Sequence, residues 1–179
     1  MTAPDAARRV LVVVATKHGA TRGIAEAIVR ELADSAAGQE MDLAVELHEA
    51  EHAPAPARFD AVIVGSAVYV GRWREPARDW VSAHAADLRG RPVWLFSSGP
   101  IGAPPIPPDE PHDVAALMQL TSARGHRVFP GRLDKGLLSV GERAMVTAMR
   151  APLGDFRDWG AVRAWSAEVA GELRNLLSA

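Results

Sequence analysis

The chain has 179 residues, of which 48% are hydrophobic, and its formal net charge is −2. This length and apolar content fit one compact domain and exclude extended disorder. The sequence contains no cysteine, which excludes disulfides, thiolate metal ligands and cysteine nucleophiles. Because the charge is nearly balanced, the composition gives no reason to expect a nucleic-acid partner.

Neither a membrane span nor a secretory leader is expected. No apolar run approaches the roughly 20 residues that cross a bilayer. The apolar run at 10–15 is also too short for the hydrophobic core of a signal peptide. A cytoplasmic protein is therefore the expectation.

The segment 10–32 predicts a buried strand followed by an amphipathic helix. Residues 10–15 form an unbroken apolar run, mostly β-branched, which is typical of a parallel strand covered on both faces. Ile24, Ile28 and Leu32 then recur at a spacing of four, which marks the buried face of a helix.

The loop between this strand and helix has the composition of a phosphate-binding loop. It reads Thr16-Lys17-His18-Gly19-Ala20-Thr21. A loop that opens a helix directs backbone N–H groups at an anion. Thr16 and Thr21 add hydroxyl donors, and Gly19 permits backbone angles that other residues avoid. The dinucleotide fingerprint and the Walker pattern are both missing, and an ordinary polar turn remains the alternative.

Strands and helices alternate along the rest of the chain, which predicts a parallel sheet with helices on both faces. The expected elements are an edge strand at 43–47, a buried strand at 61–65 ending in a loop at 66–71, a helix after Pro76, a buried strand at 92–96, a helix at 113–123, a strand at 127–133, a capped helix at 139–149 and a helix at about 159–177. A proline-rich loop occupies about 101–111, as either a lid or a spacer.

Several stretches carry a resemblance to a known family. They are the T-x-x-G-x-T loop with Ile24-Ala25, the stretches 60–71 and 128–133, and Asp158-Trp159 before the last helix. On these residues the chain resembles the flavodoxin-domain superfamily, and within it the menaquinone-dependent protoporphyrinogen oxidase family. The resemblance runs from about residue 9 to residue 173.

The resemblance implies an α/β fold, a flavodoxin-like three-layer sandwich over a single domain of residues 1–179. Its five-stranded parallel sheet has the order 2-1-3-4-5, with helices on both faces. Ligands of such sheets bind at the carboxyl ends of the strands, where the strand order reverses. The loops after Ala15, Gly65 and Phe96 are therefore expected to converge on one crevice.

The resemblance also implies FMN as the cofactor. The first loop would hold the phosphate, and the second would lie along the isoalloxazine, with Tyr69 as the stacking residue. The third would contact the other face of the ring or its pyrimidine edge. A surface aromatic at Tyr69 and a simple turn at Ser97-Ser98 remain alternatives. The expected cofactor-binding residues are Thr16, Lys17, His18, Gly19, Ala20, Thr21, Ser66, Ala67, Val68, Tyr69, Val70, Gly71, Ser97, Ser98, Gly99, Pro100 and Ile101; no catalytic side chain and no metal ligand is expected.

The helical insertion at about 134–156 departs from the oxidase family. It is shorter here and is dominated by Leu, Met, Ala and Val rather than by basic and aromatic residues, which weakens any transfer of quinone or porphyrinogen specificity. Its helix at 139–149 has three interpretations: it covers the flavin, contacts a partner, or packs on the sheet. Packing on the sheet is the favoured one.

Residues 48–52 read H-E-x-x-H, the zinc-protease signature. That site needs a helix to bring both histidines to one face. The preceding residues alternate as in a strand, and Pro54 and Pro56 follow, so a chance match is favoured over a zinc site.

Three functions remain open. The favoured one is an FMN-dependent oxidoreductase that relays electrons from a small substrate to a second acceptor. The alternatives are a flavodoxin-type electron-transfer protein without its own substrate and a domain that has lost flavin. Lys17, His18, Arg22, Arg72 and Arg74 are expected around the phosphate end of the crevice, either as solvated side chains on the loop rims or to attract an anionic cofactor or substrate. A balanced chain with arginines near the loops favours the enzyme, because dedicated electron carriers of this type are usually strongly acidic. The expected partners are a small-molecule substrate or a redox protein, with a quinone among the candidates, and a homodimer stays open.

Overall fold

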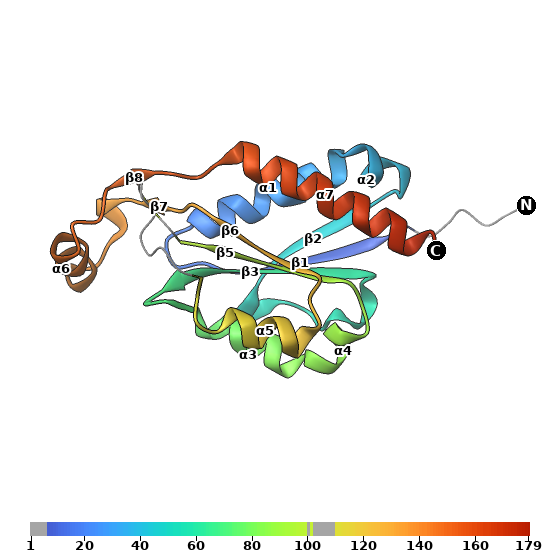
Figure 1. Ribbon diagram of the computed structural model, residues 1–179, viewed down its shortest axis with the longest axis horizontal. Helices are drawn as coiled ribbons and strands as arrows, with labels where there is room; N and C mark the ends of the chain where they lie inside the picture. The colour runs from blue at the N-terminus through green and yellow to red at the C-terminus, as the bar shows by residue number, and fades with distance from the viewer. Residues whose placement is uncertain (1–6, 100, 102–109) are drawn as a thin grey trace, which may run out of the picture.

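The computed structural model describes residues 7–99, 101 and 110–179 of the chain. Within these residues it has three layers, a central sheet with helices on both faces (Figure 1). The expectations for Pro100 and for residues 102–109 of the proline-rich loop lie outside the described residues.

The central sheet is built on five parallel strands in the order β2-β1-β3-β5-β6. The apolar runs of the sequence form the three inner strands, whose residues are buried except for Arg9 at the start of β1 and residues 67–69 at the end of β3. A short sixth strand, β4, pairs antiparallel with the end of β3. The bounds of the strands are β1 Arg9–Ala15, β2 Ala44–Glu49, β3 Ala61–Tyr69, β4 Arg72–Trp73, β5 Val93–Ser98 and β6 Gly125–Phe129.

Parallel pairing aligns the strand ends in one row. Ala15 of β1 pairs with Ser66 of β3, Ser66 pairs with Ser97 of β5, and Ser97 pairs with Val128 of β6. We call these four residues the terminal row. Residues that follow the terminal row in each strand lie at the carboxyl edge of the sheet, so the segments after it meet at one end of the molecule.

Helices on the two faces enclose two hydrophobic cores. One face is covered by α1 (Ala20–Asp34), α2 (Ala36–Glu40) and α7 (Trp159–Leu177). The other is covered by α3 (Glu75–Ala83), α4 (Ala85–Arg89) and α5 (Val114–Thr121), together with the 3₁₀ turns Ala50–His52 and Pro56–Arg58. Among the described residues, no helix is both long enough and apolar enough to cross a membrane.

The prediction of five parallel strands in the order 2-1-3-4-5 missed the antiparallel strand β4. The loop expected at 66–71 is wrong for most of its length, because β3 continues to Tyr69 and turns back into β4 as a hairpin. Ala67 still pairs with Ser98 of β5, which extends the ladder beyond the apolar run.

The single strand predicted at 127–133 is also wrong. Strand β6 ends at Phe129, before Pro130, which has no N–H group to donate to the ladder. The chain then forms β7 (Arg132–Leu133), which pairs antiparallel with β8 (Gly154–Asp155). These two short strands close the insertion at its base.

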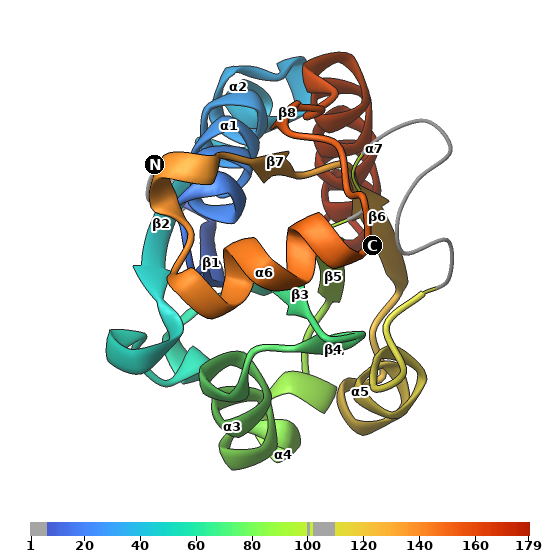
Figure 2. The same ribbon diagram turned by 90° about the vertical axis from the view of Figure 1, so that its left-hand side faces the viewer.

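The insertion does not pack on the sheet, contrary to the favoured interpretation. It contains a 3₁₀ turn, Lys135–Leu137, and helix α6 (Val140–Ala148). Figure 1 shows α6 projecting beyond one end of the sheet, and Figure 2 shows it crossing in front of the ends of the strands. The predicted capping box is confirmed, since Ser139 Oγ accepts from Glu142 N and the Glu142 carboxylate accepts from Ser139 N.

Candidate functional site

A cavity of about 160 Å³ lies at the carboxyl edge of the sheet, beneath α6. All three predicted loops contribute to its walls, so their predicted convergence on one crevice is confirmed. Residues of β7 and α6 complete it. The lining residues are Thr16, Lys17, His18, Ala20, Thr21, Ala67, Val68, Tyr69, Ser98, Gly99, Ile101, Gly131, Arg132, Leu133, Leu138, Glu142, Met145 and Val146.

Most of the predicted cofactor-binding residues that lie just past the terminal row line this cavity. Eleven of them do so, from Thr16 to Thr21 with the exception of Gly19, from Ala67 to Tyr69, and at Ser98, Gly99 and Ile101. The predicted residues Gly19, Ser66, Val70, Gly71 and Ser97 are not among the lining residues. Pro100 lies outside the described residues.

The first loop is held in shape by its own backbone and side chains. Thr16 Oγ accepts from Gly19 N at 3.0 Å, and Gly19 has a φ of 82°, in the left-handed region that glycine tolerates. No side chain caps the start of α1. The first amides of a helix have no intrahelical acceptor and carry the positive end of the helix dipole, so they suit an anion.

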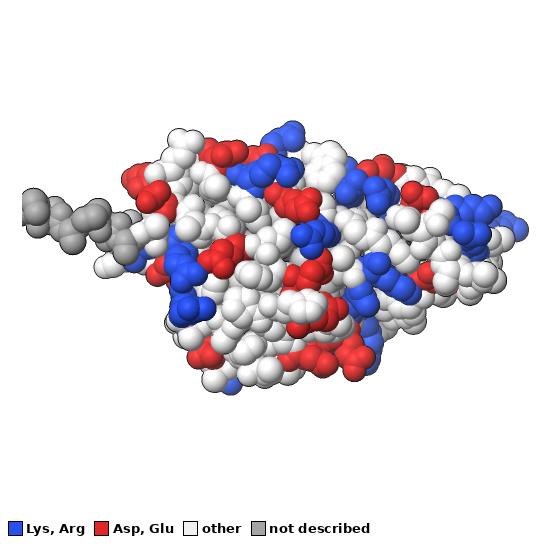
Figure 3. Space-filling view, turned by 180° about the vertical axis from the view of Figure 1, so that it is seen from behind, with Lys and Arg blue, Asp and Glu red and all other residues white. Residues whose placement is uncertain are grey.

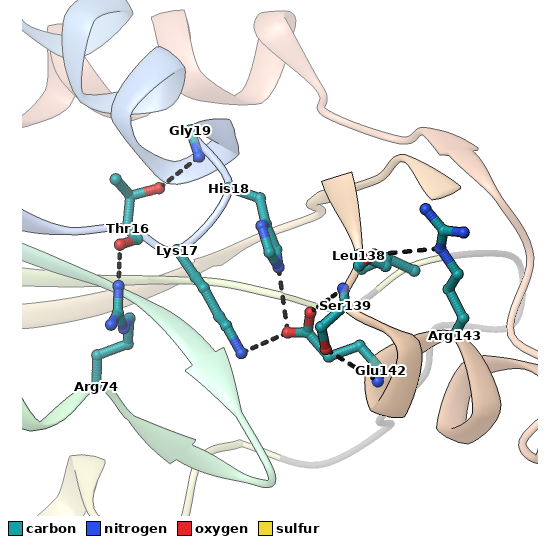
Figure 4. A network of polar contacts seen from close by, with 9 residues as sticks. All are labelled: Thr16, Lys17, His18, Gly19, Arg74, Leu138, Ser139, Glu142 and Arg143. Atoms are coloured by element: carbon teal, nitrogen blue, oxygen red, sulfur yellow. Dashed lines mark hydrogen bonds and ion pairs between the residues drawn. The ribbon is translucent and has the colours of Figure 1, made fainter. Parts of the chain in front are cut away.

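An arginine from the other face of the sheet donates a hydrogen bond to the backbone of this loop. The guanidinium of Arg74, at the start of α3, donates to the Thr16 carbonyl oxygen (Figure 4). Arg74 is therefore a fixed positive charge next to the loop. Arg22 pairs instead with Glu26 and Glu49, so its charge is directed away from the cavity.

Lys17 and His18 both contact Glu142 of α6. The Lys17 ammonium pairs with the Glu142 carboxylate, and His18 Nε2 lies 3.2 Å from Glu142 Oε1 (Figure 4). The pKa of Glu142 is strongly lowered, mainly by the hydrogen bond from Lys17 and next by the backbone N–H of Ser139. The same contact with Glu142 raises the pKa of Lys17.

The second segment is the hairpin between β3 and β4. Val70 and Gly71 both have positive φ, 50° and 71°, as the two central residues of the tight turns favoured in hairpins do. Positive φ is unfavourable for a β-branched residue such as Val70. Tyr69 is 40% exposed at this hairpin, and Lys17 Nζ lies 4.0 Å from the centre of its ring.

Ser66 and Ser97 point away from the cavity because they belong to the terminal row. Both are fully buried. Ser66 Oγ accepts from Arg74 N at 2.9 Å. Ser97 Oγ accepts from Trp73 Nε1 at 2.7 Å and lies 2.7 Å from His126 Nε2, so its hydroxyl can donate to the ring. Each hydroxyl is thus bonded within the protein, on the face of the sheet that α3 and α5 cover, and not at the cavity.

Sequence reasoning missed the contribution of β7 to the cavity and gave the covering of the ligand site by the 139–149 helix only as an alternative to its packing on the sheet. Gly131, Arg132 and Leu133 belong to a stretch that carried the family resemblance, but no ligand role was assigned to it. The Ser139 capping box did identify the start of α6. No signal in the sequence indicated that Glu142 would be directed at the first loop.

The H-E-x-x-H segment does not form the helix that a zinc protease requires. His48 lies in β2, whereas His52 ends the following 3₁₀ turn. Across residues 7–99, 101 and 110–179 no cluster of three metal-ligating side chains occurs.

A comparison with protein families gives a match along most of the chain. A family model described as a flavodoxin domain matches residues 11–159. A search of curated proteins finds no match.

Solved structures with the same fold share little sequence with this chain. An archaeal flavodoxin is 13% identical over 93% of this chain and 99% of that one, with a TM-score of 0.61. A WrbA-like flavodoxin from Agrobacterium tumefaciens is 14% identical over 94% and 99%, with a TM-score of 0.58. The rubredoxin:oxygen oxidoreductase of Desulfovibrio gigas is 11% identical with a TM-score of 0.63, and the match covers 96% of this chain but 37% of that one. At such identities these matches establish the shared fold alone.

The left-handed Gly19 predicts an asymmetry between two glycine substitutions. Gly19→Ala should lower the free energy of unfolding by about 1–2 kcal/mol, because its Cβ is strained at positive φ. Gly171→Ala, inside α7 with no atom within 4 Å of the new Cβ, should raise it by about 0.5–1 kcal/mol. Urea unfolding measures both, and equal effects would contradict the left-handed assignment.

Buried His126 predicts that stability falls on mild acidification. Burial lowers its pKa, against the opposing effect of Glu110. Below about pH 6.5, the ordinary histidine value, the unfolded chain therefore binds a proton before the folded chain does, and folding is disfavoured. The free energy of unfolding should decrease from pH 7.5 to 5.5, and less so in His126→Gln. Exposed His52→Gln serves as the control, and an identical slope in all three proteins would contradict the assignment.

Proposed function

The chain belongs to the flavodoxin domain family, and on this basis we propose that it binds FMN in the cavity beneath α6 and transfers electrons through it. FMN is the cofactor of flavodoxin-domain proteins. The observation that carries the proposal is the convergence of the three strand-end segments on one cavity at the start of α1.

The donors around the first loop fit the phosphate of FMN. The amides that begin α1 and the hydroxyls of Thr16 and Thr21 can donate to phosphate oxygens. Lys17 adds a positive charge on the cavity side of the loop, and the His18 ring adds a polar nitrogen there. A phosphate dianion needs this combination of short donors and cations.

The remaining walls suit a flat aromatic ring. Val68 and Tyr69 lie on the hairpin side, and Met145 and Val146 lie on α6. The third segment passes close to the second, since a Cβ on Gly99 would meet Val68 Cβ at 2.9 Å. The lack of a side chain at Gly99 therefore leaves backbone amides near the cavity, where they can contact polar atoms of a ring.

FMN supplies the redox chemistry itself, because its ring system accepts and releases electrons or hydride. The side chains of this chain bind the cofactor, orient it and exclude water. We assign none of them as a general acid or base. Tyr69, at 40% exposure, remains the candidate for shielding the ring.

The surroundings of the cavity favour an oxidoreductase over a dedicated electron carrier. Lys and Arg gather at the end of the molecule from which α6 projects (Figure 3). Exposed Lys135, Arg143 and Arg150 belong to that segment, and such a surface attracts anionic substrates or partners. The Desulfovibrio protein, by its name, passes electrons between rubredoxin and oxygen, which illustrates the kind of redox partner proposed here.

The relationship to menaquinone-dependent protoporphyrinogen oxidases rests on the sequence resemblance alone. Neither the family description nor the three structures compared above names such an enzyme. Turnover of protoporphyrinogen with a quinone by the FMN-loaded protein would test this finer assignment.

Removing the two hydroxyls of the first loop should weaken FMN binding. In Thr16→Ala/Thr21→Ala the phosphate loses two direct donors, and hydrogen bonds to charged groups contribute about 1.5–3 kcal/mol each. We therefore expect the Kd for FMN, measured by quenching of flavin fluorescence, to rise by about a hundredfold or more.

The conservative variant Thr16→Ser/Thr21→Ser retains both hydroxyls and should bind FMN within about threefold of the wild type. Riboflavin lacks the phosphate, so its affinity should differ little between the wild type and the alanine variant. Undiminished FMN binding in the alanine variant would contradict the assignment of the phosphate to this loop.

A further inference from the structure

Helix α6 is anchored to the rest of the molecule by a charged residue. Glu142 is the one residue of α6 that is buried, with 5% of its surface exposed. Val140 of the same helix faces solvent at 84% exposure, and Met145, which borders the cavity, is 39% exposed. A charged residue therefore takes the buried position that an apolar residue occupies in the usual amphipathic pattern.

The anchor is the contact with the first loop. Among the described residues, the polar side-chain contacts between α6 and the body of the protein run from Glu142 to Lys17 and His18. Arg143 and Thr147 bond only within the insertion, to the carbonyl oxygens of Leu138 and Arg143. Loss of the Glu142 contact would therefore leave α6 held by van der Waals contacts and by the β7–β8 pair.

We propose that Glu142 acts as an internal anion that fastens α6 over the cavity, and that the phosphate of an incoming ligand displaces it from Lys17 and His18. The proposal rests on the proposed function for the identity of the ligand, FMN. The fastening itself depends only on the contacts within the chain.

Charge and geometry both indicate that a bound phosphate and the Glu142 carboxylate would compete for Lys17 and His18. The Lys17 and His18 side chains extend from the first loop toward Glu142 (Figure 4). A phosphate held at that loop would repel the Glu142 carboxylate and would compete with it for the Lys17 ammonium and the His18 ring nitrogen. Lys17 also covers the ring of Tyr69, with Nζ 4.0 Å from its centre. Release of Glu142 would free Lys17 to leave that ring.

The cavity is also narrowed by α6. Its volume of about 160 Å³ is well below the roughly 300–1,000 Å³ of pockets that enclose a drug-sized ligand. Met145 and Val146 of α6 form part of the wall opposite the strand ends. Displacing Glu142 would allow these side chains to withdraw and enlarge the cavity.

The contact can be reached from solvent on the side of Lys17. The Lys17 side chain is 36% exposed, so solvent screens its pairing with Glu142, although the Glu142 side chain itself is 6% exposed. An incoming phosphate can therefore reach the ammonium and compete with the carboxylate for it.

The test compares the wild type with Glu142→Gln. Glutamine at this position preserves the capping box with Ser139 but removes the negative charge. We expect the flavin-free variant to bind FMN about fivefold more tightly than the wild type. Riboflavin, which has no phosphate and gains only from the loosened helix, should gain less than about twofold. Glu26→Gln, an exposed glutamate paired with Arg22 near the same loop, should leave both affinities unchanged.

Other outcomes would overturn the proposal. Equal gains for FMN and riboflavin would mean that α6 obstructs the cavity without competing for the phosphate. Unchanged or weaker FMN binding in Glu142→Gln would mean that Glu142 does not compete at all.

Hydrogen exchange separates failure of this inference from failure of the proposed function. If the wild type does not bind FMN, the proposed function fails, but the fastening can still be measured. The α6 amides should exchange about fivefold faster in Glu142→Gln than in the wild type. Inorganic phosphate should accelerate their exchange in the wild type and not in the variant. Equal exchange in both proteins, with or without phosphate, would refute the role of Glu142.

Discussion

Ala15, Ser66, Ser97 and Val128 lie in one row across four neighbouring strands because parallel backbone hydrogen bonds align them. This register determines which side chains reach the cavity. The serines of the row are buried and bonded beneath the sheet, while the residues after them line the cavity. A ligand at this edge therefore contacts segments far apart in the sequence but level in the sheet.

The same edge gathers positive charge and polar donors. The start of α1, the guanidinium of Arg74 and the side chains of Lys17 and His18 all lie around one loop. Glu142 reaches this loop from helix α6, of which it is the one buried residue. Binding of an anion and the position of α6 are thereby linked through one carboxylate.

The sequence predicted the sheet well because its inner strands must be apolar on both faces. It also predicted the position of the first loop, because small polar residues separate the apolar strand from the amphipathic helix. Ser66 and Ser97 were misassigned to loops because a polar residue after an apolar run resembles the start of a loop. In the structure the hydrogen-bond ladder of the sheet extends past both residues. The place of α6 depends on a contact between residues 17 and 142, which no local periodicity encodes.

The central claim is that the first loop holds the phosphate of FMN, and a crystal structure of the protein with FMN tests it most directly. The account predicts phosphate oxygens within hydrogen-bonding distance of Thr16, Thr21 and the first amides of α1. The ring should lie between Tyr69 and the segment after Ser97, with Glu142 no longer paired with Lys17. Flavin bound elsewhere, or a phosphate remote from this loop, would contradict the account.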